Sequence, residues 1–154
     1  MALCKKGISS LKKLTSKGTY VLIVELPKDT LITVGKLGTF MFSAGFYGYV
    51  GSAHGGLYKR LKRYFSPSRK RRWHIDYLLK EGTIKAIFAC ESKERIECTI
   101  AQRLQQTLAP ILGFGVSDCL CLSHLYYHPN ERALRGEIIR AFNSCMCSII
   151  EIEA

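Results

Sequence analysis

The chain has 154 residues, of which 47% are hydrophobic and 23% are charged. It is therefore long and apolar enough for one globular domain, and its composition argues against a disordered protein. Lysine and arginine number 23 against 12 acidic residues, and the excess lies in the first half, where residues 1–75 carry 15 basic and 2 acidic side chains. Such a one-sided positive field favours a polyanionic partner, nucleic acid ahead of an anionic membrane, over a simple solubility role.

Neither an export signal nor a membrane span is predicted. Residues 1–14 lack the apolar run of a secretory signal, and apolar runs such as residues 20–24 fall far short of the about 20 residues that cross a bilayer. The seven cysteines are an odd number in a chain without an export signal. We therefore expect a cytoplasmic protein with reduced thiols, no obligatory disulfide framework and no membrane partner.

The first 52 residues predict a basic leader followed by strands. Residues 1–17 carry five lysines and form either a short helix capped by Ser9 or a frayed tail. β-branched, apolar and aromatic runs between glycine- and proline-containing turns are typical of strands. Four such runs predict strands at residues 19–26, 31–34, 39–42 and 46–52.

The remainder of the chain predicts helices and two further strands. Apolar side chains four residues apart, such as Ile96, Ile100 and Leu104, indicate a helix with a candidate N-cap at Ser92. Helices are expected at residues 57–65, 73–79, 93–108 and 129–142, and strands at residues 83–90 and 119–127. We therefore predict an α+β fold with a single domain over residues 18–154, in which helices pack on a small, mainly antiparallel sheet.

Two tripeptides at the predicted strand boundaries stand out, Gly18-Thr19-Tyr20 and Tyr49-Val50-Gly51, followed by Arg60 and Glu97 on predicted helices. This ordered set resembles the GIY-YIG nuclease superfamily, closest to its Uri-type branch, over roughly residues 17–128. The resemblance implies an α+β domain acting as a metal-dependent endonuclease on DNA. It also implies that both tyrosines lie on adjacent strands, that Arg60 is catalytic, and that Glu97 binds Mg²⁺ or Mn²⁺.

The same residues suit the chemistry of phosphodiester hydrolysis. The planar fork of Arg60 can grip two phosphoryl oxygens, and the Glu97 carboxylate can hold a hard divalent cation. A tyrosine hydroxyl can position or deprotonate water if nearby cations lower its pKa. Glu91 and Glu94 are alternatives to Glu97, which is preferred because it follows Ile96 near the buried edge of its helix.

Residues 59–72, called here the basic segment, hold eight cations and no acid. Cations neutralise phosphates and aromatic rings can stack on bases, although Trp73, just after the segment, is expected in the core. The candidate nucleic-acid contacts are Lys59, Lys62, Arg63, Arg69, Lys70, Arg71 and Arg72. His54 and His74 are candidate acids or bases for catalysis, and a structural hydrogen bond is the alternative for His74 and its neighbour Asp76.

Cys119, Cys121 and His124 are possible zinc ligands, because zinc accepts cysteine and histidine in tetrahedral sets. The spacing C-x-C-x₂-H is not that of a standard zinc finger, however, which favours buried thiols instead. Two rivals to the DNA endonuclease therefore stay open: a nucleic-acid-binding module with little or no cleavage, and a zinc-stabilised interaction protein. DNA is the expected partner, with RNA as the alternative and with no small-molecule cofactor.

Overall fold

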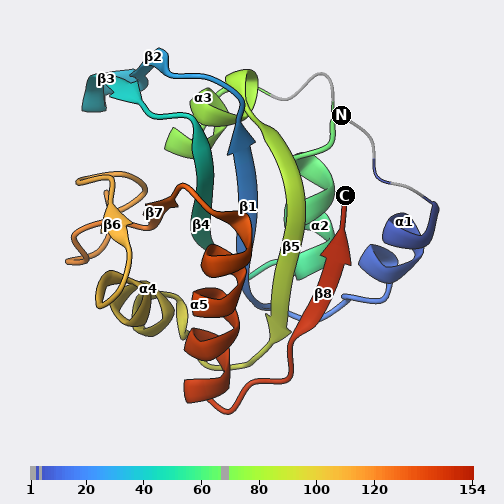
Figure 1. Ribbon diagram of the computed structural model, residues 1–154. Coiled ribbons are helices and arrows are strands. Elements are labelled where there is room, and N and C mark those ends of the chain that lie inside the picture. Colours follow the sequence, from blue (N-terminus) through green and yellow to red (C-terminus); the bar gives the residue numbers. More distant parts are fainter. Residues whose placement is uncertain (1–2, 4, 67–69) are drawn as a thin grey trace.

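The computed structural model describes residue 3, residues 5–66 and residues 70–154 (Figure 1). The strands are β1 (Gly18–Leu26), β2 (Thr30–Val34), β3 (Gly38–Phe42), β4 (Gly45–Ala53), β5 (Thr83–Glu91), β6 (Ala109–Pro110), β7 (Leu125–His128) and β8 (Ile150–Glu153). The helices are α1 (Lys5–Lys12), α2 (Leu57–Arg63), α3 (His74–Glu81), α4 (Glu97–Gln105) and α5 (Glu131–Ser144), with a 3-10 turn η1 (Gly35–Leu37).

Six of these strands form one antiparallel sheet in the order β6-β7-β4-β1-β5-β8, and β2 pairs with β3 in a separate hairpin. The predicted α+β class is thereby confirmed. The central position of β1 between β4 and β5 agrees with its composition, since a strand with neighbours on both sides and layers on both faces is mainly apolar, as Tyr20 to Val24 are.

Helices cover both faces of the sheet, as Figure 1 shows for α5 and α2. Alternate residues of a strand point to opposite faces. Accordingly, Tyr20, Leu22 and Val24 of β1 belong to the core cluster shared with α1, α2 and α3, whereas Val21 and Ile23 belong to the cluster shared with α4 and α5. The sheet is therefore the middle of three layers, and β1 crosses the centre of the core.

The glycines of both tripeptides have packing roles in the paired strands. Gly18 lies opposite Glu91 of β5, and a Cβ atom at Gly18 would come within 2.1 Å of the carbonyl oxygen of Cys90. Gly51 lies opposite Tyr20, and a Cβ atom there would come within 2.4 Å of the Tyr20 ring. A side chain at either position would thus push apart strands that hold Tyr20 in place.

Three predicted elements are corrected by the structure. The helix expected from residue 93 begins at Glu97, because the Ser92 hydroxyl bonds to the backbone of Glu94 and makes a local turn instead of a helix cap. Residues 119–124 form a loop, so that the strand expected there is limited to β7. The last helix starts at Glu131 and ends at Ser144.

Strands β6 and β8, which extend the two edges of the sheet, were not predicted. The leader contains the helix α1, one of the two alternatives for residues 1–17, but Ser9 lies inside this helix and does not cap it. Leu11 and Leu14 of the leader are buried in the main core. Within the part of the chain that the structure describes, no helix has the length and apolarity needed to cross a membrane.

Candidate functional site

A polar pocket of about 260 Å³ opens where β4, α2, α4 and the loop before β7 come together. Its lining residues are Tyr49, Gly51, Ser52, His54, Arg60, Trp73, Arg95, Glu97, Gly115 and Asp118. Three of the four residues singled out from the sequence, Tyr49, Arg60 and Glu97, therefore face one cavity. The fourth, Tyr20, is fully buried, and its ring packs under Gly51 in the pocket wall.

The tyrosines beside the pocket are held as neutral hydroxyls. The hydroxyl of Tyr20 lies 2.5 Å from that of Tyr64 in the core. Burial raises the pKa of Tyr20, although the hydrogen bond to Tyr64 and the charge of Arg60 act in the opposite direction. Burial also raises the pKa of Tyr49 well above its ordinary value. The condition under which a tyrosine could deprotonate water is thus not met, and these hydroxyls can only donate or accept hydrogen bonds.

Arg60 is the cation of the pocket. Burial disfavours its charged form, but the oxygens of Tyr20, Tyr64 and Tyr49 outweigh this, and the pKa of Arg60 stays above its ordinary value. Its guanidinium stacks on the Trp73 ring, 4.4 Å from the ring centroid. A stacked guanidinium has a fixed plane, which suits it to a forked contact with an oxyanion.

Glu97 is the first residue of α4 and contacts two elements at once. Its Oε1 lies 2.8 Å from Nδ1 of His124, and its side chain is 26% exposed. Burial would raise the pKa of Glu97, but the neighbouring His124 imidazole and Ser52 hydroxyl outweigh burial and hold that pKa below its ordinary value. Glu91 and Glu94, the alternatives considered from the sequence, are exposed and do not line the pocket.

The two histidines proposed as acids or bases differ in their placement. His54 is exposed on the pocket rim, with Nε2 3.3 Å from the Ser52 hydroxyl. His74 does not line the pocket; its Nδ1 accepts a hydrogen bond from the backbone N–H of Gly115 at 2.8 Å. Burial lowers the pKa of His74, whose ring packs against Phe114. This placement is the structural hydrogen bond that the sequence left open as the alternative.

The basic segment is organised by one buried carboxylate. Both oxygens of Asp76 accept hydrogen bonds from Arg63, at 2.9 and 2.8 Å, and one also accepts the backbone N–H groups of Arg72 and Trp73. Arg63 is therefore engaged within the protein. Trp73 is half-buried and stacks with Arg63 as well as with Arg60, so it is part of the pocket wall.

The remaining candidate contacts to nucleic acid are exposed where the structure describes them. Arg69 lies outside the described residues. The exposed cations are Lys59, Lys62, Lys70, Arg71 and Arg72. They lie on α2 or just before α3, the two segments that also supply Arg60 and Trp73 to the pocket.

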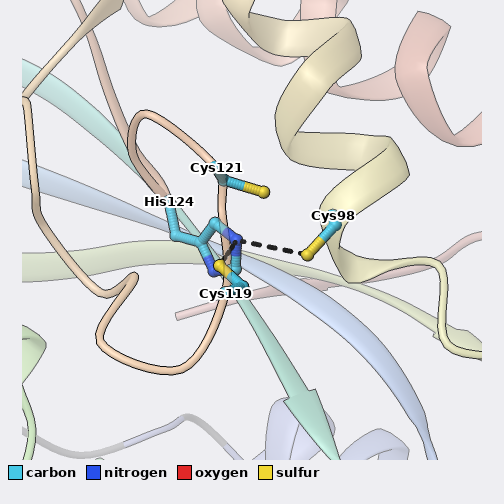
Figure 2. Close-up of side chains that lie close together, drawn as sticks. All are labelled: Cys98, Cys119, Cys121 and His124. Atoms are coloured by element: carbon cyan, nitrogen blue, oxygen red, sulfur yellow. Dashed lines mark hydrogen bonds between the residues drawn. The ribbon is translucent and has the colours of Figure 1, made fainter.

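A second group of side chains lies next to the pocket. Cys98 of α4 meets Cys119, Cys121 and His124 of the loop before β7 (Figure 2). The four ligand atoms all lie within 4.8 Å of one another, and Nε2 of His124 is 3.6 Å from Sγ of Cys119 and 3.9 Å from Sγ of Cys98. We call these four residues the Cys3His cluster; it can hold a metal ion.

The donor set of the Cys3His cluster suits a soft or borderline cation. Three sulfur atoms and one imidazole are the ligands of tetrahedral zinc sites, whereas Mg²⁺ prefers oxygen. Burial and the neighbouring thiols raise the pKa of Cys121 to about 12. Without a cation the Cys121 thiol therefore keeps its proton, and a bound cation would replace it.

Cys98 was missed in the sequence because it lies 21 residues before Cys119 and on another element. No spacing in the sequence links Cys98 to residues 119–124, so this pairing depends on the fold. The objection to zinc from the unusual spacing also fails, because residues 119–124 form a loop in which both cysteines and His124 come together with Cys98.

Residues 19–147 match the family model described as "Domain of unknown function DUF123". No curated protein and no solved structure matches the chain. The matched family is distinct from the GIY-YIG nucleases, so the resemblance drawn from the two tripeptides is wrong as a family assignment. Tyrosine and glycine at these strand positions are explained by packing, as the contact of Gly51 with Tyr20 demonstrates.

Proposed function

We propose that the pocket binds a phosphodiester of nucleic acid, DNA in the first instance, and that the protein hydrolyses this bond. The chain belongs to the DUF123 family, whose function is unknown, so the proposal is drawn from the pocket itself. The observation that carries this proposal is the convergence of Arg60, Glu97 and His54 on one polar pocket next to the exposed cations of the basic segment. Fold class plays no part in the proposal, since one fold serves many functions.

Binding would begin with the exposed cations. Five described lysines and arginines of the basic segment are exposed, and together with Arg60 they form a positive surface beside the pocket. Such a surface attracts the phosphate backbone and releases counterions from it, whatever the base sequence. The phosphate nearest the pocket would then meet Arg60, whose plane is fixed by Trp73.

Hydrolysis needs a water oxygen to attack phosphorus, the P–O bond to the leaving oxygen to break, and the water proton to be taken up. Arg60 can stabilise the charge that builds up on the phosphoryl oxygens. His54 is the exposed imidazole on the pocket rim that can accept the proton, because the buried tyrosines keep theirs. The hydroxyl of Tyr49 can donate a hydrogen bond to a phosphoryl oxygen or to the water.

Glu97 and Asp118 are the carboxylates that line the pocket. Carboxylate oxygens, completed by phosphate and water, are the ligands that Mg²⁺ and Mn²⁺ prefer. Such a cation would supply charge neutralisation at the phosphoryl group. The pKa of Glu97 lies below its ordinary value, which keeps that carboxylate ionised at neutral pH.

The test compares Arg60→Lys with Arg103→Lys in single-turnover cleavage of supercoiled DNA with Mg²⁺ or Mn²⁺. Both changes keep the charge, but Arg103 is exposed on α4 away from the pocket. Loss of the forked contact should slow cleavage by about 10²–10³-fold for Arg60→Lys, by analogy with lost oxyanion donors. Arg103→Lys should cleave at the wild-type rate.

Binding without cleavage by the wild-type protein, with either cation, would refute hydrolysis and leave the nucleic-acid-binding module. Equal rates for the two variants would make Arg60 one more member of the positive surface. A repeat with single-stranded DNA and RNA of the same sequence would identify the preferred substrate, since these differ in the shape of their phosphate backbone.

A second role is supported by the Cys3His cluster, which we propose holds Zn²⁺ as a structural metal. Its sulfur and nitrogen atoms come from α4 and from a loop that has little regular structure of its own, so that a bound ion would join the two. Metal analysis of the purified protein should give one zinc per chain. Cys121→Ser should lower this content strongly, whereas Cys145→Ser, outside the cluster, should keep it.

A further inference from the structure

His124 connects the two sites, because each of its ring nitrogens faces a different one. Nε2 faces the thiols of Cys98 and Cys119 (Figure 2), and Nδ1 lies 2.8 Å from the Glu97 carboxylate in the pocket wall. The ring is 1% exposed. A metal ion that binds Nε2 and fixes the orientation of the ring therefore also fixes the position of Nδ1 relative to the Glu97 carboxylate.

We infer that a metal ion in the Cys3His cluster positions Glu97 in the pocket through His124, so that the metal content of the cluster controls the pocket. The effect of this metal ion on hydrolysis rests on the proposed function. The link between the metal ion and the Glu97 carboxylate does not depend on that function. Glu97 is thus a positioning residue for the cluster as well as a residue of the pocket.

The first step of the argument concerns the proton of His124. A metal ion on Nε2 fixes the imidazole proton on Nδ1 and makes Nδ1 a donor. In the structure Nδ1 is buried and lies 2.8 Å from Oε1 of Glu97, yet it makes no regular hydrogen bond. Coordination at Nε2 would fix the orientation of the ring and give the buried N–H its acceptor.

The second step concerns the start of α4. Its N-cap residue is Ile96, whose side chain makes no capping hydrogen bond, so the first turn lacks that support. Glu97 and Cys98 are the first two residues of this turn. A metal ion bound to Cys98 would hold the backbone of the turn, while His124 would hold the carboxylate of Glu97. Both anchors depend on the same ion.

The test measures zinc affinity by competition with a chromogenic chelator, in the full-length chain. Removing a carboxylate that supports a metal-bound histidine typically weakens binding by about 10–100-fold. We expect that loss for Glu97→Ala and a smaller one for Glu97→Gln, whose amide oxygen still accepts a hydrogen bond. Glu94→Ala, an exposed carboxylate three residues earlier, should stay within about threefold of wild type.

A spectroscopic readout separates this role from a general loss of structure. The cobalt-substituted protein should show the visible bands of a tetrahedral site with thiolate ligands, and Glu97→Ala should alter them, whereas Glu94→Ala should not. Near-ultraviolet circular dichroism of each variant checks that it is folded. Unchanged zinc affinity and unchanged bands in folded Glu97→Ala would overturn the link.

The outcomes also separate the link from the proposed function. If Glu97→Ala binds zinc weakly and no form of the protein cleaves nucleic acid, the link holds and hydrolysis fails. If the wild-type protein cleaves and Glu97→Ala binds zinc as tightly as wild type, hydrolysis stands and the link fails. Arg60→Lys, which has no contact with the cluster, should bind zinc like the wild type in either case.

Discussion

Asp76 is the buried anion on which the geometry of the basic segment depends. It is 1% exposed and accepts two hydrogen bonds from Arg63 and one from each of the backbone N–H groups of Arg72 and Trp73. Asp76→Asn keeps the volume of the side chain but removes its charge. It also replaces one acceptor oxygen by an amide group that faces other N–H donors.

The cost of this change follows from the burial of the pair. Removing one partner of a buried ion pair costs about 3–5 kcal/mol. Because the Arg63 side chain keeps 23% exposure and can be partly hydrated, we expect the lower end, about 3 kcal/mol. For a domain of this length the melting temperature should fall by about 6–12 °C. Glu81→Gln, an exposed carboxylate on the same helix, should cost less than about 0.5 kcal/mol.

The pH dependence gives the refuting result. Burial would raise the pKa of Asp76, but the hydrogen bonds from Arg63 and from the backbone of Trp73 and Arg72 outweigh it, so the folded-state pKa lies below the unfolded value of about 3.9. The carboxylate therefore stabilises the fold fully above that pH and loses its effect as the pH falls through the folded-state pKa. Urea unfolding of wild type and Asp76→Asn should differ between about pH 5 and 7 and converge in stronger acid. Equal midpoints at pH 7 would refute the reasoning.

The salt dependence of DNA binding, the packing of Gly51 and the metal of the Cys3His cluster can each be measured directly. Fluorescence anisotropy should give a log–log slope of about −4 to −5 for duplex DNA, and a flat titration would take the basic segment out of the interface. Gly51→Ala should cost about 1–3 kcal/mol of unfolding free energy, because its Cβ would meet the ring of Tyr20. Gly55→Ala, with no atom within 4 Å of its Cβ, should cost far less. Equal losses of unfolding free energy in the two variants would contradict this packing. A strong chelator should lower the melting temperature of the wild type and leave the melting temperature of Cys121→Ser unchanged. If the chelator does not change the melting temperature of the wild type, a structural ion is excluded.

The centre of the sheet could be predicted from the sequence because both faces of β1 are buried. An unbroken run of β-branched and apolar residues indicates a strand that is buried on both faces, whatever elements surround the strand. The ionisation of the tyrosines could not be predicted in the same way. It depends on how completely Tyr20 and Tyr49 are buried, and burial outweighs the charge of Arg60 beside them.

The alternation of residues 119–124 led to a wrong strand for a physical reason. In a half-buried strand the apolar side chains face the core, but here Leu120 and Leu122 are exposed while Cys119 and Cys121 turn toward His124. The alternation thus reflects two cysteines that face His124. Single exposed leucines are common on protein surfaces, so the alternation by itself could not separate this loop from a strand.

The first residue of α4 could not be predicted either, and its position decides which side chains reach the pocket. The apolar stripe fixed the face of the helix but not its first residue, because the Ser92 hydroxyl is satisfied locally by the backbone of Glu94. With the helix beginning at Glu97, the side chains of Glu97 and Cys98 diverge by about 100° around its axis. One reaches the pocket and the other reaches the thiols, so the two sites share a single turn of helix. A displacement of that turn by one residue would take Glu97 out of the pocket and Cys98 out of the Cys3His cluster, and we therefore expect the two sites to be gained or lost together.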